Sequence, residues 1–342
     1  MLTIRSELKL RAEKGKACWK RAICSKAGDP KGSMAMLAEW KAKVKNLRKR
    51  YRWDEVLSAY LFLSPSLAVF SLFMYFPMLY ALYLSLHRWR LGKVNSTFVG
   101  LHNYQVLITS AEFWEVLRNS FYYALGSIPL NMAIALTIAL LLNRKLRGMA
   151  IFRTAYFLPT ITSTAAMAVI WLWIYHPDFG LANWLLDLIG LPRLRWLSDP
   201  RWAMPALIIM GIWKGLGYNI VIYLAGLQNI PQHLYEAARI DGADSWACFR
   251  HITWPLLTPT TFFILIIAVI NSLKAFAQMH IMTEGGPLNS TTVIVYYLYQ
   301  QGFKFFNLGY ASAVACILFA ILLILTLLQF KVLGPRVHYL GG

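Results

Sequence analysis

Six long apolar runs constrain the fold of this chain more than any other feature of its sequence. They cover about residues 56–86, 119–142, 155–175, 203–227, 255–282 and 308–330. A bilayer core about 30 Å thick is crossed by a helix of about 20 mostly apolar residues, so each run is long enough to span it. Apolar residues make up 58% of the 342 residues, compared with about 45–50% in soluble domains. We therefore expect an all-α polytopic membrane protein with six transmembrane helices.

Positive charge predicts which side of the membrane each segment faces. The chain has 34 Lys and Arg against 15 Asp and Glu. Cytoplasmic loops carry the excess of Lys and Arg in membrane proteins. With the N-terminus inside, 24 of the 34 fall inside, eight fall outside, and Lys214 and Lys274 lie within apolar runs. Both termini are therefore expected in the cytoplasm, and the charge requires no nucleic-acid partner.

The first 52 residues are predicted to form a basic cytoplasmic extension. They contain 16 Lys or Arg and no apolar stretch long enough for the core of a signal peptide. Seven of these charges lie between residues 41 and 52, directly before the first apolar run, where they would attract anionic lipid head groups. We assign residues 53–335 to the six-helix membrane domain and residues 336–342 to a cytoplasmic tail.

Two segments on the outer side are long enough to carry short helices of their own. They cover residues 176–202 and 293–303. Tryptophan and tyrosine cluster near the ends of the apolar runs, where such rings anchor a helix at head-group level. Either outer segment is therefore a place where an external partner can bind.

The sequence offers no pattern for a metal site, a disulfide framework or proton-coupled transport. The four cysteines are scattered over the basic extension, a polar loop and an apolar run, and the seven histidines lack metal-binding spacing. No acidic pair lies inside an apolar run, as a proton relay would require. These absences count against two functions, an ion-coupled secondary transporter and an integral membrane enzyme.

The polar segment between the fourth and fifth runs, residues 228–255, is predicted to form a helical elbow at the cytoplasmic face. Pro231 suits the start of a short helix that Gly242 ends, and this glycine would let two backbones approach closely. Asp244 is placed to cap a second short helix, and Pro255 to open the next span. An amphipathic elbow that merely lies along the interface remains an alternative.

The elbow carries a motif that resembles the signature of permease subunits of binding-protein-dependent ATP-binding-cassette importers. That signature is Glu-Ala-Ala, a glycine four residues after the last alanine, and a later Ile-x-Leu-Pro. The matching residues here are Glu236, Ala237, Ala238, Gly242, Ile252 and Pro255, with the frequent Asp-Gly-Ala present as Asp241, Gly242 and Ala243. Trp254 stands where the family usually has leucine, which keeps the position bulky and apolar.

The resemblance extends over about residues 56–331 and narrows the family further. The stretches FVGLHNY, AYFLPTITSTAA, LAGLQNIP and SLKAFAQMHIMTEGGP look like the sugar and glycerophosphodiester permeases of this superfamily. The resemblance implies the type I architecture of these importers. It also implies a location in the bacterial or archaeal plasma membrane.

The resemblance further implies partners for this chain. In the family the elbow is a coupling helix that sits in a groove of an ATPase subunit, so Glu236 to Ile240 would be the docking face and Gly242 the hinge. The chain has no G-x-x-x-x-G-K-[ST] phosphate loop, so it is expected to be non-catalytic and free of cofactors. ATP and Mg²⁺ would bind to two separate ATPase subunits. A second, unlike permease and an extracytoplasmic solute-binding protein would complete the importer.

Two polar clusters inside the apolar runs mark the expected path of the solute. Transporter sites lie near the bilayer midplane and are lined by broken helices and polar groups. The fourth run contributes Gly215, Tyr218 and Asn219, and the fifth contributes Asn271, Ser272 and Lys274. Amides and aromatic rings suit a sugar. Lys274 can mark an anionic solute, or it can extend to the interface from its position outward of the centre of the run.

Overall fold

The computed structural model of the chain describes residues 53–89, 97–143 and 149–336. The predicted extension of residues 1–52 and the tail after residue 336 lie outside the described residues. Contacts divide the chain into two compact units, residues 1–77 and residues 78–342. Nearly all of the described chain is helical, which agrees with the all-α expectation.

The described part of the first unit is one apolar helical segment. It consists of α3 (Trp53–Phe70), the π-helical turn η1 (Ser71–Tyr75) and the start of α4 (Phe76–Ser85). Pro65 lies inside α3 without ending it, as is tolerated in membrane helices. The stretch Leu57–Ser85 is long and apolar enough to cross a membrane.

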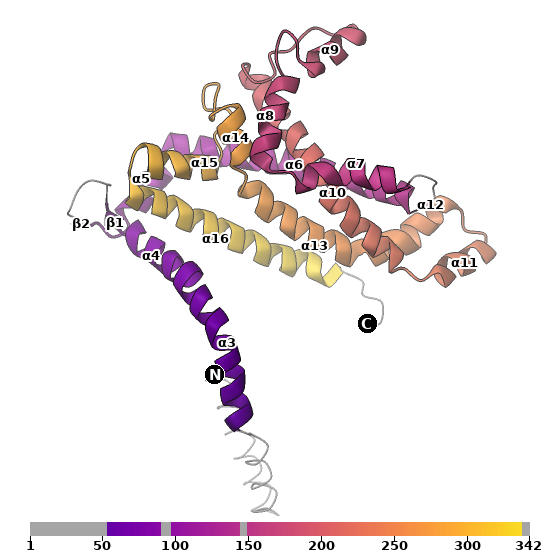
Figure 1. Cartoon of the computed structure of the whole chain (residues 1–342), viewed down its shortest axis with the longest axis horizontal. Helices are drawn as coiled ribbons and strands as arrows, with labels where there is room; N and C mark the ends of the chain where they lie inside the picture. The colour runs from indigo at the N-terminus through magenta and orange to yellow at the C-terminus, as the bar shows by residue number, and fades with distance from the viewer. Residues whose placement is uncertain (1–52, 90–96, 144–148, 337–342) are drawn as a thin grey trace, which may run out of the picture. The chain divides into compact units, whose positions relative to one another are not determined.

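Four long helices build the second unit (Figure 1). They are α6 (Ala111–Leu142), α10 (Pro200–Gln228), α13 (Trp254–Leu273) and α16 (Leu308–Leu333). Helix α10 packs along α6, and α13 lies against α6, α10 and α16. Buried apolar side chains fill the spaces between them, with Leu257 of α13, for example, packed against Ile220 and Tyr223 of α10.

Shorter elements connect these helices. They are β1 (His87–Arg88), β2 (Thr97–Phe98), α5 (His102–Thr109), α7 (Met149–Ile161), α8 (Thr164–Ile174), α9 (Leu181–Leu188), α11 (Gln232–Ile240), α12 (Ser245–Cys248), η2 (Phe249–Thr253), α14 (Ala277–Met282), α15 (Ile294–Tyr299), η3 (Gln300–Lys304) and η4 (Gly334–Arg336). The two strands pair antiparallel, with His87 opposite Phe98. Helices α9 and α15 confirm that both segments predicted to lie outside carry a short helix.

The third apolar run departs from the expected straight span. It forms two helices, α7 and α8, which meet at an angle of 113°. Pro159 in α7 cannot donate a backbone hydrogen bond, the hydroxyl of Thr162 donates to the Leu158 carbonyl at 2.9 Å, and Ser163 takes an extended backbone, with ψ 136°. Within residues 53–89, 97–143 and 149–336, five helices are long and apolar enough to cross a membrane, and the bent pair makes a sixth span if it is counted as one.

Helix α6 begins eight residues before the apolar run that predicted it. The Ser110 hydroxyl caps the helix by accepting a hydrogen bond from the backbone N–H of Phe113 at 3.4 Å. Phe113 and Val116 are buried, so the more polar first turns of α6 still pack an apolar face. The apolar run therefore marked only the more apolar, C-terminal part of the helix.

Candidate functional site

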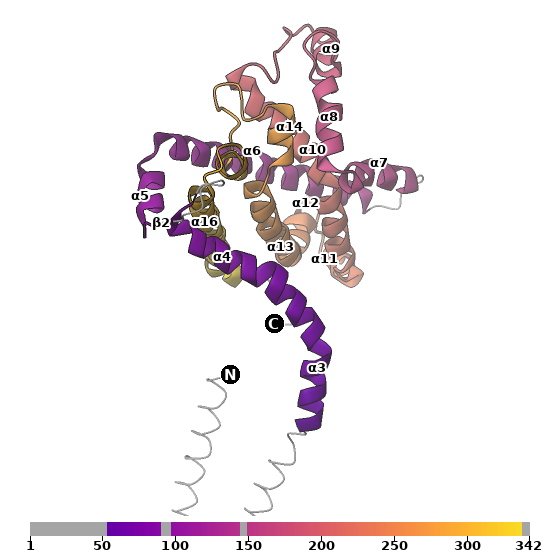
Figure 2. The ribbon, with the colours of Figure 1, turned by 60° about the vertical axis from the view of Figure 1, so that its left-hand side comes forward.

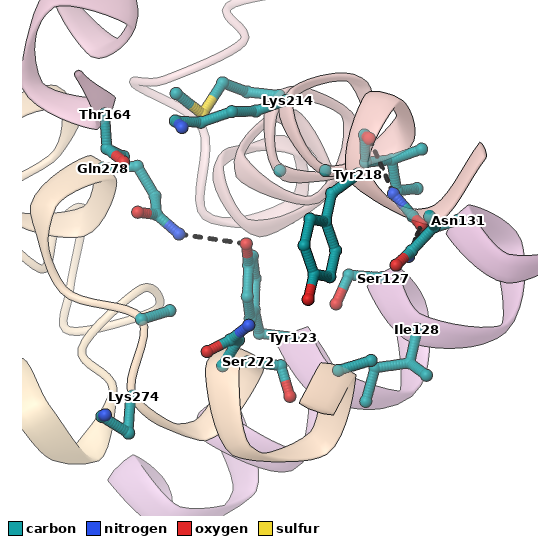
Figure 3. Close-up of a pocket in the computed structure, with 18 of the residues that line it drawn as sticks. Tyr123, Ser127, Ile128, Asn131, Thr164, Lys214, Tyr218, Ser272, Lys274 and Gln278 are labelled. Carbon is teal, nitrogen blue, oxygen red and sulfur yellow. Dashed lines mark hydrogen bonds between the residues drawn. The ribbon is translucent and has the colours of Figure 1, made fainter. Parts of the chain in front are cut away.

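An open cavity of about 540 Å³ lies among α6, α10, α13 and α14 (Figure 3). All six residues predicted for the solute path line it, namely Gly215, Tyr218, Asn219, Asn271, Ser272 and Lys274. The first three come from α10, and the others come from the end of α13, where Lys274 caps the helix. Two clusters far apart in sequence therefore form one site, although their contact with a solute stays a prediction.

Helix α6 supplies a side of the cavity that the sequence reasoning missed. Tyr123, Ser127 and Asn131 line it, and their spacing of four residues places them on one helix face. Tyr123 is buried, and its hydroxyl accepts a hydrogen bond from the Gln278 side chain in α14 at 3.0 Å (Figure 3). A polar stripe at this spacing in an otherwise apolar helix was the available signal.

Asn131 joins α6 to α10 beside the cavity. Its side-chain amide donates to the Ile212 carbonyl at 2.8 Å, and its side-chain oxygen accepts from the Asn219 amide at 2.6 Å. Asn131 is buried, so both hydrogen bonds are shielded from water and contribute to the register of the two helices. The same contact orients Asn219, one of the predicted path residues.

Two glycines of α10 allow neighbouring helices to approach closely. A Cβ at position 211 would clash with the hydroxyl of Tyr123, and a Cβ at position 217 would clash with the backbone oxygen of Tyr156 in α7. Gly211 lines the cavity, whereas Gly217 faces α7 outside it. Gly211 therefore allows α10 to pack closely against α6 at the cavity, and Gly217 allows it to pack closely against α7 outside the cavity.

The charged side chains that line the cavity are both lysines. Lys214 in α10 and Lys274 at the end of α13 contribute to its wall, and its described lining contains no Asp, Glu or His. The remaining polar groups are amides and hydroxyls, and the aromatic rings are those of Tyr123, Tyr218 and Phe276. The cavity thus combines ring faces, neutral hydrogen-bonding groups and positive charge.

The predicted cytoplasmic elbow forms at the opposite end of the second unit from α5 (Figures 1 and 2). Helix α11 has Pro231 as its N-cap, and the Asp244 carboxylate caps α12 by accepting from the Ala247 N–H at 2.7 Å. Glu236, Ala237, Ile240, Asp241 and Gly242 are exposed, whereas Ala238 and Ala243 are partly buried. Ile240 is 87% exposed, so no other described residue covers this apolar side chain.

Gly242 has a different role from the close backbone approach expected of it. Nothing lies within 4 Å of a Cβ added there, but its φ is +80°, a left-handed conformation that favours glycine. This conformation turns the chain so that the N–H of Ala243 donates to the Ala238 carbonyl at 2.9 Å. Gly242 therefore sets the angle between the two arms of the elbow.

The second arm of the elbow is continuous with the fifth apolar helix. Helix α12, η2 and α13 follow one another without a break from Ser245 to Leu273. Pro255 lies in the first turn of α13, where it was expected. Ile252 is partly buried and packs against the apolar cluster that contains Leu257, and Tyr235 of α11 is hydrogen-bonded to Thr253 at 2.9 Å. The two arms are thus joined to each other and to the membrane helix.

Hydrogen bonds order the two segments that were predicted to lie outside. The Asn183 amide donates to the carbonyls of Pro177 at 2.9 Å and Leu194 at 3.0 Å, which closes the loop around α9. In the other segment, Lys304 donates to the Tyr296 hydroxyl at 3.2 Å, and this bond raises the pKa of Lys304. Asn119 of α6 holds the loop before α15 by donating to the Asn289 carbonyl at 2.9 Å.

Comparison with known proteins places this architecture in a family. Residues 131–339 match the family described as the inner membrane component of binding-protein-dependent transport systems. The chain belongs to this family. It is therefore a multi-pass plasma-membrane transport subunit rather than an enzyme, and the system it serves uses a binding protein.

Relatives of this transport subunit match it over most of their lengths. A probable ABC transporter permease from Pyrococcus horikoshii is 39% identical, over 78% of this chain and 92% of that protein. The lactose transport system permease of Rhizobium radiobacter is 37% identical, over 84% and 97%. The sn-glycerol-3-phosphate transport system permease of Agrobacterium fabrum is 34% identical, over 82% and 96%.

A solved structure matches the fold of the subunit. The crystal structure of a bacterial ABC transporter involved in the import of the acidic polysaccharide alginate has a chain that aligns with a TM-score of 0.72 and 26% identity. The alignment covers 85% of this subunit and 99% of that chain. The predicted architecture of an importer permease is thereby confirmed.

Proposed function

We propose that this subunit conducts a sugar, a related polyol or a glycerophosphodiester through the plasma membrane of a bacterium or archaeon, as the permease of an ATP-driven importer. The relatives named above serve lactose and sn-glycerol-3-phosphate transport, which supports this class of solute. The cavity adds chemical support, because ring faces suit sugar rings and amides suit hydroxyl groups. The solute-binding protein would deliver the solute from the outer side, and both termini of the chain would be cytoplasmic.

One structural observation carries the proposal: the two helices that flank the elbow also line the cavity. Helix α10 carries Tyr218 and ends at Gln228, and three residues separate it from the start of α11. On the other side, the continuous helix from Ser245 reaches Asn271, a rise of roughly 39 Å at about 1.5 Å per residue. A rigid movement of the elbow would therefore reposition both walls of the cavity.

The elbow is the proposed contact with the ATPase subunits. ATP and Mg²⁺ would bind to the ATPase subunits, because this chain has no phosphate-binding loop. A second permease would face this one across the solute path. Driving a two-state pore from about 1:99 to 99:1 takes about 5.5 kcal/mol of differential binding. A docked, hydrogen-bonded elbow is able to transmit such an energy. The exposed Glu236, Ala237, Ile240 and Asp241 would form its docking face, with Gly242 at the turn.

Replacing one exposed apolar side chain of the elbow tests the proposed docking. Ile240→Asp should abolish co-purification of the ATPase subunits, because docking would bury an apolar side chain worth about 1.5–3 kcal/mol and a carboxylate in its place would be desolvated. Ile240 is 87% exposed, so the change should leave the fold of this chain intact.

A matched control is available at the outer side. Leu288 is 86% exposed and lies in the loop before α15, so Leu288→Asp should retain the ATPase subunits. Equal recovery of ATPase with both variants would refute docking through the elbow. Loss of ATPase from both would point to general instability, which a thermal unfolding curve of each variant would reveal.

A further inference from the structure

We propose that a second pocket of the structure binds the head group of a zwitterionic phospholipid, with the lipid phosphate at Arg88 and the ammonium group at Glu112. This Arg88–Glu112 pocket has a volume of about 410 Å³, within the range of about 300–1,000 Å³ typical of ligand pockets. It lies at the α5 end of the second unit, opposite the elbow (Figures 1 and 2). None of its described lining residues also lines the cavity on the solute path, so the two sites are separate.

Stretches of the chain that are distant in sequence are held together to form the Arg88–Glu112 pocket. The backbone N–H of Gly309 in α16 donates to the carbonyl of Trp89, a lining residue, at 3.2 Å. A Cβ at position 309 would clash with the His87 carbonyl oxygen, so glycine is needed for this close approach. The buried Asn103 side chain of α5 donates to the same carbonyl of His87 at 3.0 Å. These contacts fix α5, α16 and the strand β1 around the pocket.

Two opposite charges line the pocket without pairing with each other. Arg88 comes from β1 and Glu112 from the first turn of α6. No ion pair or hydrogen bond joins the guanidinium or the carboxylate to another side chain within residues 53–89, 97–143 and 149–336. Both side chains are exposed, so a ligand from outside the chain is able to reach them. A ligand that carries both charges satisfies both side chains at once.

The pocket lies beyond the hydrocarbon core, at the level of the lipid head groups. Helix α6 has 32 residues and is about 48 Å long at about 1.5 Å per residue, whereas the core is about 30 Å thick. Its three charged residues, Glu112, Glu115 and Arg118, all lie within its first eight residues. This charged end therefore extends past the core, and the apolar remainder of the helix crosses it. Helix α16, which is also apolar enough to cross a membrane, contributes Tyr310 to the pocket from its first turn.

Exposed apolar side chains beside the pocket favour a lipid over a soluble ligand. Val106 of α5 lines the pocket and is exposed, and Leu101 and Ile108 are exposed near the two ends of the same helix. Trp114 of α6 is exposed as well, and its indole N–H donates to the Ile108 carbonyl at 2.7 Å. Such side chains contact the boundary between head groups and acyl chains, where aromatic rings are enriched. A lipid held by its head group would cover them with its glycerol and acyl chains.

The chemistry of the pocket matches the two charges of such a head group. An arginine guanidinium binds a phosphate through paired hydrogen bonds, and a carboxylate attracts an ammonium group. The rings of Tyr297 and Tyr310, whose hydroxyls are hydrogen-bonded at 3.1 Å, line the same pocket, and a cation is attracted to the face of such a ring. The pocket therefore suits phosphoethanolamine or phosphocholine better than a head group that carries only negative charge.

Lipid binding to the complete importer, purified in detergent and followed by native mass spectrometry, tests this inference. The probes are phosphatidylethanolamine, phosphatidylcholine and phosphatidylglycerol with the same acyl chains. We expect the two zwitterionic lipids to bind, and phosphatidylglycerol to bind about tenfold more weakly, because it has no cation for Glu112. Equal binding of the three lipids would overturn the proposal.

Variants of this chain assign the binding to the pocket. Arg88→Gln and Glu112→Gln should each lower the affinity for the zwitterionic lipids about 10-fold to 100-fold, the range for a lost charge-assisted hydrogen bond. Matched controls are Arg118→Gln and Glu115→Gln, which change charges at the same end of α6 but outside the described lining of the pocket; these should bind as the wild type does. Thermal unfolding of each variant checks the fold, and equal affinities for pocket and control variants would overturn the proposal.

A water-soluble competitor separates a membrane lipid from a free phosphodiester. Glycerophosphoethanolamine carries the same head group without acyl chains, so it should compete at least about tenfold more weakly than the lipid, because it buries fewer CH₂ groups. Competition as strong as that of the lipid would overturn the lipid assignment. The assay needs neither ATP nor transported solute, so its result is independent of the proposed function.

Discussion

At the scale of single residues, Asn131 shows how a buried amide organises the wall of a cavity. Its two hydrogen bonds, to the Ile212 carbonyl and the Asn219 amide, fix one helix against another in a region where apolar packing alone would allow sliding. A buried polar group that loses its partner costs about 1–3 kcal/mol. The residue is thus important for both the stability of the helix pair and the orientation of a cavity side chain.

We expect Asn131→Leu to lower the free energy of unfolding by about 1–3 kcal/mol, because it leaves the Asn219 amide without its acceptor. Thermal unfolding of the purified protein in detergent measures the loss. Thr137→Ala is the control, since Thr137 is an exposed residue of the same helix that bonds only within it, to the Ala133 carbonyl at 2.8 Å. A melting temperature for Asn131→Leu equal to that of the control would contradict the role assigned to Asn131.

Residue patterns in the sequence anticipated the elbow better than they anticipated the cavity. Pro231, Asp244 and Pro255 act through local chemistry, as N-cap or early helix residues, so their positions follow from neighbouring residues. The contribution of α6 to the cavity could not be predicted from neighbouring residues in this way, because it depends on which helices pack against α6. Tyr123 and Asn131 were identified only when α6 was placed beside α10 and α14.

At the scale of elements, the elbow and the bent third span show what apolar periodicity cannot predict. A run of apolar residues indicates that a segment is buried or lies in the membrane. It does not predict the 113° bend at Thr162 and Ser163, which depends on a proline, on a hydroxyl that donates a hydrogen bond to a carbonyl, and on packing against neighbouring helices. Gly242 is a similar case: the glycine was recognised, but its left-handed φ of +80° is a property of the folded turn.

We expect Gly242→Val to uncouple ATP hydrolysis from uptake by distorting the angle between α11 and α12, because a β-branched residue is strained at positive φ. Gly190→Val is a matched control: Gly190 has a φ of +73° and open space around it, but it lies in the outer loop after α9. The ratio of solute transported to ATP hydrolysed should fall severalfold for Gly242→Val and stay constant for Gly190→Val. Equal ratios for the two variants would contradict a coupling role for the turn.

At the scale of the whole molecule, two long helices join the elbow, which we propose as the docking element, to a polar cavity. Helix α10 enters the elbow directly, and the continuous helix from Ser245 to Leu273 leaves it. Composition and charge predicted a membrane protein with its positive side at this elbow, and the family match confirmed a transport subunit. The connection between elbow and cavity is a property of the three-dimensional fold, since the residues involved are distributed over α6, α10, α13 and α14.

The most direct test of the account is uptake of labelled solute into proteoliposomes that contain this chain with its partner permease and ATPase subunits, with the binding protein outside. The account predicts accumulation that requires both ATP and the binding protein, is insensitive to collapse of ion gradients, and disappears with Ile240→Asp. Accumulation that persists without ATP and follows an ion gradient would contradict it, because the chain would then be working as a secondary transporter.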